Sequence, residues 1–137
     1  MIEVKNIYKS FNKTEVLNKI DTIFYRGKTN LIIGQSGSGK TVLLKCLLGL
    51  YEVDLGEILY DGISSKNMGI NEKLEISRQM GMVFQGSALF DSMNVLENVR
   101  FPLDMLTEID ENEKNDRALK FIERVNLKAV SYTHLRA

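Results

Sequence analysis

Eight consecutive residues of the chain have the types and the spacing of a phosphate-binding loop. The run GQSGSGKT, residues 34–41, matches the pattern G-x-x-x-x-G-K-[ST] at every specified position. Glycines permit a tight turn whose backbone N–H groups converge on anionic oxygens. Lys40 can reach the β- and γ-phosphates of a nucleoside triphosphate, and the Thr41 hydroxyl can ligate Mg²⁺. The pattern therefore predicts a site for a nucleoside triphosphate and its magnesium ion.

The segments on either side of this loop have the character of a strand and a helix. The apolar run 31–33 has no polar face, which is typical of a parallel strand covered on both sides. Residues 40–50 are almost entirely apolar, which predicts a buried helix whose positive N-terminal end faces the phosphates. A Gly/Ser turn arising by chance would not explain this strand–loop–helix context.

Strand patterns precede the loop and recur after it. Residues 2–5 and 16–24 alternate apolar with polar side chains, which predicts an antiparallel β element. Residues 57–60 form a further strand with a turn at Asp61-Gly62, and residues 80–84 a second buried strand. With the loop and its flanking elements, these strands indicate an α/β fold.

Helical patterns dominate the rest of the chain. Residues 71–79 form one expected helix. Asn94 can cap a short helix over residues 95–99, which Pro102 would close off, and Asp110 can cap a longer helix through Val125. Beyond Phe90 the character of the chain therefore changes to helix.

Composition and charge limit the classes of partner. The 137 residues have room for one compact domain, with 44% hydrophobic and 26% charged residues. Eighteen basic and eighteen acidic residues give no net field, so we expect no nucleic-acid partner. The first residues lack the apolar core of a leader, and no apolar run approaches the ~20 residues that cross a bilayer. The lone Cys46 suits a reducing compartment, so we expect a cytoplasmic protein that reaches membranes through a partner.

Three separated landmarks resemble the ATP-binding-cassette (ABC) ATPases. Within the run 34–62 they are the phosphate loop 34–41 and the turn-rich segment DLGEILYDG, residues 54–62, and the third is Gln85 after the apolar residues 82–84. The resemblance covers residues 2 to about 128 and implies an α/β P-loop NTPase fold of the ABC type. In that fold an N-terminal antiparallel β element precedes a parallel core and a helical subdomain. Here the parallel core would be partial and the helical subdomain only begun, so we expect an incomplete domain.

The resemblance implies roles for particular residues. Phe11 lies where the family places an aromatic ring that stacks on adenine, with Tyr8 as the competing candidate. Gln85 matches the glutamine that contacts magnesium and the attacking water, so Lys40 and Gln85 are the expected catalytic residues, and Thr41 and Gln85 the expected metal ligands. ATP and Mg²⁺ are the expected cofactors. The expected nucleotide-binding residues are Phe11, Gly34, Ser36, Gly37, Ser38, Gly39, Lys40, Thr41 and Val42.

One subgroup of the family resembles this chain more narrowly. Residues 84–99, together with Val42 after the phosphate loop, are similar to the ATPases of MCE-type phospholipid transporters. This likeness implies a homodimer that binds a membrane permease, with an MCE-type periplasmic protein as a further partner. Through the permease, the protein would be peripheral on the inner face of the cell membrane. Phe90, Met93 and Asn94 lie where the family meets its permease, although packing inside the helical part explains them equally well.

The chain departs from the family at its end. It has no L-S-G-G signature, no apolar strand ending in Asp-Glu, and no histidine placed for the γ-phosphate. We therefore expect residues 1–128 to be the N-terminal part of the domain, residues 129–137 to be a non-native tail, and this chain alone to be inactive as an ATPase. The alternatives are a non-catalytic nucleotide-binding fragment, an ABC ATPase for another substrate class, and a small P-loop kinase that uses residues 87–91 as a short acidic strand.

Overall fold

The computed structural model describes residues 1–84, 86 and 89–127, and these divide into two units. The first unit spans Met1–Met82, and the second begins at Val83. The expected tail, residues 129–137, and the expected catalytic Gln85 lie outside the described residues. No helix in the described part of the chain is long and apolar enough to cross a membrane.

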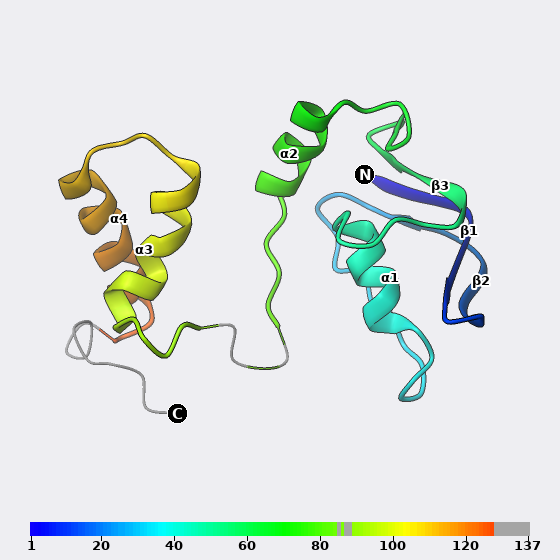
Figure 1. Ribbon diagram of the computed structural model, residues 1–137, viewed down its shortest axis with the longest axis horizontal. Helices are drawn as coiled ribbons and strands as arrows, with labels where there is room; N and C mark the ends of the chain where they lie inside the picture. The colour runs from blue at the N-terminus through cyan, green and yellow to red at the C-terminus, as the bar shows by residue number, and fades with distance from the viewer. Residues whose placement is uncertain (85, 87–88, 128–137) are drawn as a thin grey trace. The chain divides into compact units, whose positions relative to one another are not determined.

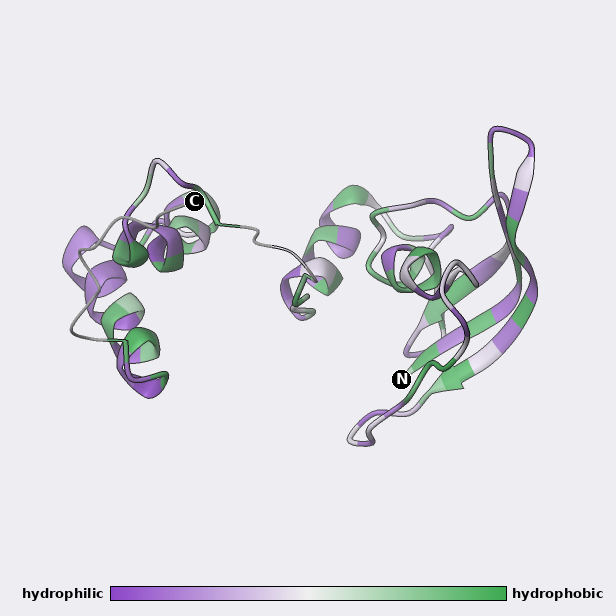
Figure 2. Cartoon of the chain, turned by 90° about the horizontal axis from the view of Figure 1, so that it is seen from below, coloured by the Kyte–Doolittle hydropathy of each residue, from purple (hydrophilic) through white to green (hydrophobic). Residues whose placement is uncertain are grey.

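The first unit is built on an antiparallel sheet with strand order β2-β1-β3-β4 (Figure 1). Strand β1, Ile2–Phe11, pairs with β2, Thr14–Phe24, and on its other side with β3, Leu55–Tyr60. The two-residue strand β4, Ile63–Ser64, completes the sheet. Hydropathy alternates along the long strands (Figure 2), because successive side chains point to opposite faces. The predicted N-terminal antiparallel element is confirmed.

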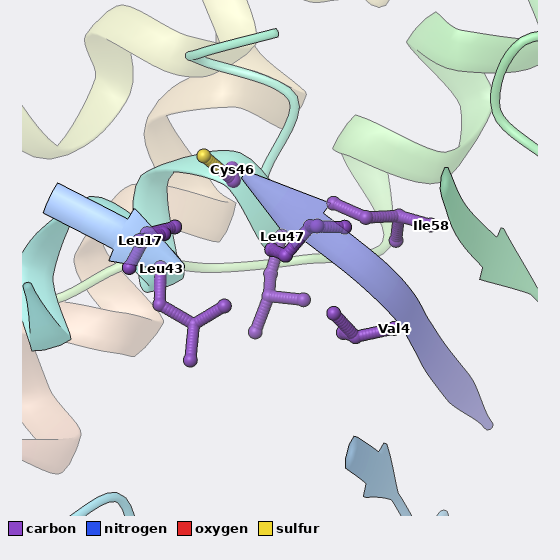
Figure 3. Packing of buried hydrophobic residues seen from close by; sticks show 7 residues of the cluster. Val4, Leu17, Leu43, Cys46, Leu47 and Ile58 are labelled. Carbon is purple, nitrogen blue, oxygen red and sulfur yellow. The ribbon is translucent and has the colours of Figure 1, made fainter. Parts of the chain in front are cut away.

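Helix α1, Lys40–Leu47, packs its buried face against this sheet (Figure 3). The side chains that meet there are apolar and almost fully buried: Val4, Ile7, Leu17, Leu43, Cys46, Leu47 and Ile58. The Tyr60 hydroxyl donates a hydrogen bond to the Leu47 carbonyl over 2.9 Å, which ties β3 to the end of α1. Burial raises the pKa of the Cys46 thiol, so this side chain serves as packing.

A single glycine allows β1 and β3 to approach at an irregular point of the sheet. Gly56 has a φ of +80°, and a Cβ there would lie 2.1 Å from the Asn6 carbonyl oxygen. Both features exclude a side chain, since the clash is with backbone that cannot rotate away. Gly56 therefore permits the close approach of the β3 backbone to the β1 backbone at Asn6.

Two predicted strands of the parallel core are wrong for this structure. Residues 31–33 and 80–84 have no strand conformation, and Leu31 and Ile33 are 81% and 82% exposed. An extended apolar segment becomes a strand only when a neighbour accepts and donates its backbone hydrogen bonds. Within the described ranges no strand lies beside either segment. For the same reason α1 is not buried all round, and Leu44 stays 42% exposed.

Three further helices follow β4. Helix α2, Ile70–Arg78, completes the first unit, and the second unit contains α3, Val95–Leu106, and α4, Glu111–Arg124. Leu96 of α3 and Ala118 and Ile122 of α4 form the core of this helical pair. Asn94 and Asp110 are the N-caps of α3 and α4, as the sequence predicts.

The prediction that Pro102 closes α3 is wrong, because the helix continues to Leu106. Proline has a fixed φ close to the helical value, and its missing N–H removes only one hydrogen bond. The packing of α3 on α4 offsets that loss.

Candidate functional site

The glycine-rich loop leads directly into α1 and leaves the first turn of the helix without a side-chain cap. Gly39 is the N-cap residue at a φ of +89°, and its neighbour in the loop, Gly37, has a φ of +79°. In the described residues no side chain caps this end, and no acidic residue lies in the first turn. Backbone N–H groups at the start of a helix bind anions when no side chain satisfies them. The geometry fits a phosphate group.

Lys40 joins the two ends of the loop. Its Nζ donates hydrogen bonds to the carbonyl oxygens of Gly34 (2.8 Å) and Gln35 (2.7 Å). The ammonium group therefore sits at the mouth of the loop, where its charge can meet phosphate oxygens. The loop residues from Gly34 to Ser38 are exposed and accessible to a ligand.

The first residues of α1 divide between solvent and core. Thr41 is exposed, so its hydroxyl is accessible, whereas Val42 is half-buried and packs against the core of the first unit. Among the described residues no three His, Cys, Asp or Glu side chains gather as metal ligands. The exposed Thr41 hydroxyl is a hard oxygen donor that fits magnesium, which takes one or two protein groups and completes its shell with phosphates and water.

Gly39 also contacts the β1–β2 hairpin. A Cβ on this residue would lie 2.9 Å from the Val16 carbonyl oxygen and 3.0 Å from Leu17 Cδ2, so the loop rests directly on β2. Val16 follows Thr14 by two residues, and Thr14 is the register partner of Phe11. The hairpin thus brings the aromatic candidate to the same part of the unit as the phosphate loop. The sequence pattern gave no sign of the Val16 contact.

Phe11 ends β1 with 37% of its surface exposed. Its ring meets the Tyr51 ring edge to face, with centroids 5.2 Å apart and planes at 65°. The competing candidate, Tyr8, is half-buried inside β1, where it pairs with Leu55 of β3. Of the two rings, Phe11 has the more exposed position.

Two lysines and an aspartate surround the Phe11–Tyr51 pair. Lys9 Nζ lies 5.3 Å from the Phe11 centroid, and Lys45 Nζ lies 5.1 Å from the Tyr51 centroid. Lys9 also donates to Asp54 Oδ1 over 2.7 Å; this bond, and one from the Ser10 N–H, hold the pKa of the Asp54 carboxyl below its usual value. Sequence reasoning missed Lys9, Lys45 and Tyr51, because no local pattern brings Phe11 and Tyr51 together across 40 positions.

The second unit contains the segment that the resemblance assigns to a permease contact. Phe90 is 46% exposed and packs against Phe101, with ring centroids 4.8 Å apart. Met93 is half-buried, and the Asn94 side chain accepts the Glu97 N–H as the cap of α3. Packing inside the helical unit therefore accounts for part of this segment, and the Phe90 ring also remains accessible.

A buried amide holds this segment in place. Asn98 Oδ1 accepts the Phe90 N–H over 2.7 Å, and its Nδ2 donates to the carbonyl oxygens of Phe90, Met93 and Asn94. These bonds satisfy both ends of the amide, so residues 90–94 are fixed against the first turns of α3.

Known proteins match the chain along nearly all of its length. It is 35% identical over 137 residues to the methionine import ATP-binding protein MetN of Bartonella henselae, covering 98% of this chain and 40% of MetN. It is 37% identical over 131 residues to the Arabidopsis thaliana protein TRIGALACTOSYLDIACYLGLYCEROL 3, chloroplastic, covering 95% of this chain and 37% of that protein. The chain therefore spans about two fifths of these relatives.

A solved structure agrees with the fold. The ATP-binding cassette MJ0796, a dimer in a post-hydrolysis state bound to ADP and Pi, matches with a TM-score of 0.83 and 27% identity, covering 98% of this chain and 61% of that one. The family model described as ABC transporter matches residues 17–137. Together with the uncapped phosphate loop at the start of α1, these matches establish that the chain belongs to the ABC transporter family and carries part of its ATP-binding domain.

Proposed function

We propose that this protein is an ATP-binding and, in its full-length form, ATP-hydrolysing subunit of an ABC transporter. The observation that carries the proposal is the phosphate loop itself. Lys40 bridges the loop carbonyls, and the first turn of α1 offers its backbone N–H groups without a competing side chain. Both features stabilise the β- and γ-phosphates of a nucleotide.

Each nucleotide-binding residue has a role in this proposal. Gly34, Ser36, Gly37, Ser38 and Gly39 supply the loop backbone, Lys40 neutralises phosphate charge, and Val42 anchors the helix start in the core. Phe11 stacks on the adenine. Thr41, with Gln85 from outside the described residues, would hold Mg²⁺, which when bound neutralises charge on the β- and γ-phosphate oxygens. Phosphoryl transfer depends mainly on such positioning and charge neutralisation.

The partners follow from the family. We propose a second copy of the subunit, as in the dimeric cassette, and a membrane permease that positions the protein on the cytoplasmic face. For the cargo we propose a phospholipid, with an MCE-type periplasmic protein as a further partner. The likeness of residues 84–99 to MCE-associated ATPases supports this cargo, and a relative whose name contains that of a galactosyl diacylglycerol supports a lipid cargo more generally. The name of MetN favours an amino acid as the alternative cargo.

The ATPase proposal is tested with Lys40→Ala in the full-length protein. We expect ATP turnover to fall to that of a protein-free control, since the loop loses its cation. Lys28→Ala, which removes a lysine from the exposed turn before the loop, is the matched control and should turn over normally. Turnover of Lys40→Ala within twofold of wild type would refute the assignment.

The cargo proposal needs a separate experiment. The full-length ATPase and its co-purified permease are placed in bilayers of phosphatidylglycerol or in micelles of a neutral synthetic detergent, each with and without methionine. We expect ATP turnover to rise in the phospholipid. A rise with methionine that is the same in both environments would replace phospholipid by an amino acid as the cargo.

A further inference from the structure

The segment after α1 holds the ring of Phe11 in place. Tyr51 approaches that ring at 65° with centroids 5.2 Å apart, which is the edge-to-face geometry that aromatic pairs prefer. Tyr51 is itself half-buried and packs partly against the core of the first unit. Its ring is thus a fixed surface, whereas Phe11 at the end of β1 is partly exposed.

Hydrogen bonds attach the segment 51–54 to β1 at one end and to α1 at the other. The Asp54 N–H donates to the Tyr8 carbonyl over 2.9 Å, and the Asp54 carboxylate accepts from Lys9 Nζ and the Ser10 N–H. Three consecutive residues before Phe11 are therefore bound to a single residue of the 51–54 segment. At the other end, the Tyr51 N–H donates to the Lys45 carbonyl of α1 over 3.2 Å.

These contacts join Phe11 to the helix that starts at the phosphate loop. From the loop, α1 runs to Lys45, which connects to Tyr51, and Tyr51 meets Phe11. The base platform and the phosphate site are therefore linked through the end of α1 as well as through the contact of Val16 with Gly39. A ring held in one orientation binds a base more tightly than a free one, because less side-chain freedom is lost on binding.

We propose that Tyr51 is a positioning residue for the nucleotide base, holding the Phe11 ring in the orientation that stacks on adenine. The inference rests on the proposed ATP site and adds a residue to it. Tyr51 acts through Phe11, and none of its described contacts is with a residue of the loop 34–39. Its loss should therefore weaken only the part of binding that depends on the base.

The experiment measures the affinity of the full-length protein for Mg-ATP and for magnesium tripolyphosphate, which has the phosphates without the base. Tyr51→Leu keeps apolar bulk against the core but removes the aromatic edge. The cost of ordering one free side chain on binding corresponds to about a two- to twelvefold change in affinity. We expect Tyr51→Leu to lose that factor for ATP and nothing for tripolyphosphate.

Three further variants define the result. Tyr51→Phe keeps the ring and should bind ATP like wild type, because the hydroxyl contacts only Lys45 Nζ at 3.5 Å among the described contacts. Phe11→Ala should weaken ATP binding by about five- to more than a hundredfold. Tyr25→Leu, at the opposite end of the β1–β2 hairpin, is the matched control and should change neither affinity.

Each outcome separates the inference from the proposed function. Equal losses of ATP and tripolyphosphate in Tyr51→Leu would show a general structural role and overturn the inference. It would also fail if Phe11→Ala weakened ATP binding while Tyr51→Leu did not, or if Phe11→Ala had no effect; the ATP site would stand in both cases. Wild-type protein that bound neither ligand would refute the proposed function itself.

Discussion

Substituting Gly39 tests whether the phosphate loop rests on β2 as the structure shows. Gly37 and Gly39 both have a left-handed φ, of +79° and +89°. A Cβ on Gly37 would meet no atom within 4 Å, whereas one on Gly39 would lie 2.9 Å from the Val16 carbonyl oxygen and 3.0 Å from Leu17 Cδ2. Gly37→Ala is therefore a control that shares the backbone strain and lacks the clash.

The expected costs follow from these two terms. A left-handed conformation costs an alanine about 1–2 kcal/mol. Removing glycine from the unfolded chain returns about 0.4–1 kcal/mol. Gly37→Ala should thus lower the free energy of unfolding by about 0–1.6 kcal/mol. Gly39→Ala should lose about 1–3 kcal/mol more, because an extra methyl group in a packed site forces its neighbours to move.

The measurement is urea unfolding of both full-length variants without nucleotide. A further loss of ATP affinity in Gly39→Ala is expected, since the loop must shift away from β2. If the unfolding free energies of the two variants agreed within about 0.5 kcal/mol, the reasoning would be refuted. A difference that small is within the scatter of such measurements and leaves no cost for the clash. The loop would then be free of β2, and the link between Gly39 and Val16 would carry no energy.

Two other predictions concern single hydrogen-bonded side chains, one in each unit. Asn98→Asp should lower the free energy of unfolding of the full-length protein, measured in a thermal melt, by about 1–3 kcal/mol. A carboxylate cannot donate a hydrogen bond to the three carbonyl oxygens that the Asn98 amide binds. Asn115→Asp should be nearly neutral in the same melt, since its oxygen accepts from Arg100 and keeps that role; similar losses in both variants would contradict the account. Asp54→Asn should make the free energy of unfolding fall less steeply as the pH is lowered into the acid range. The folded-state pKa of Asp54 is lowered, first by the Lys9 hydrogen bond, so its contribution is present above the unfolded pKa of about 3.9 and is lost as pH falls through the folded value. If urea unfolding below about pH 4 gave the same pH dependence of the unfolding free energy in Asp54→Asn and wild type, that contribution would be excluded.

Features that depend on neighbouring residues could be predicted from the amino-acid sequence. The tight glycine turn before Lys40 and the helix after it, the alternation along the first two strands, and the caps at Asn94 and Asp110 all appear in the structure as expected. Each rests on contacts between residues two to four positions apart, or on the conformational freedom of single glycines. Such local preferences are written directly in the order of the side chains.

The elements that the prediction got wrong depend on partners distant in the chain. Residues 31–33 and 80–84 have the composition of buried strands, but a strand exists only beside another strand, and none of the described strands pairs with either segment. Pro102 ends a helix in isolation, yet α3 continues because α4 packs against it. In both cases tertiary contacts outweighed the local preference.

The same distinction applies within the candidate site. The sequence indicated Lys40 and Phe11 separately, one by its loop and one by a family resemblance. Only the tertiary structure places Val16 against Gly39 and Tyr51 against Phe11. These contacts join residues 23 and 40 positions apart, which meet because the antiparallel sheet returns the chain to β1 on either side of α1. No spacing rule encodes such a meeting, because it depends on how whole elements pack.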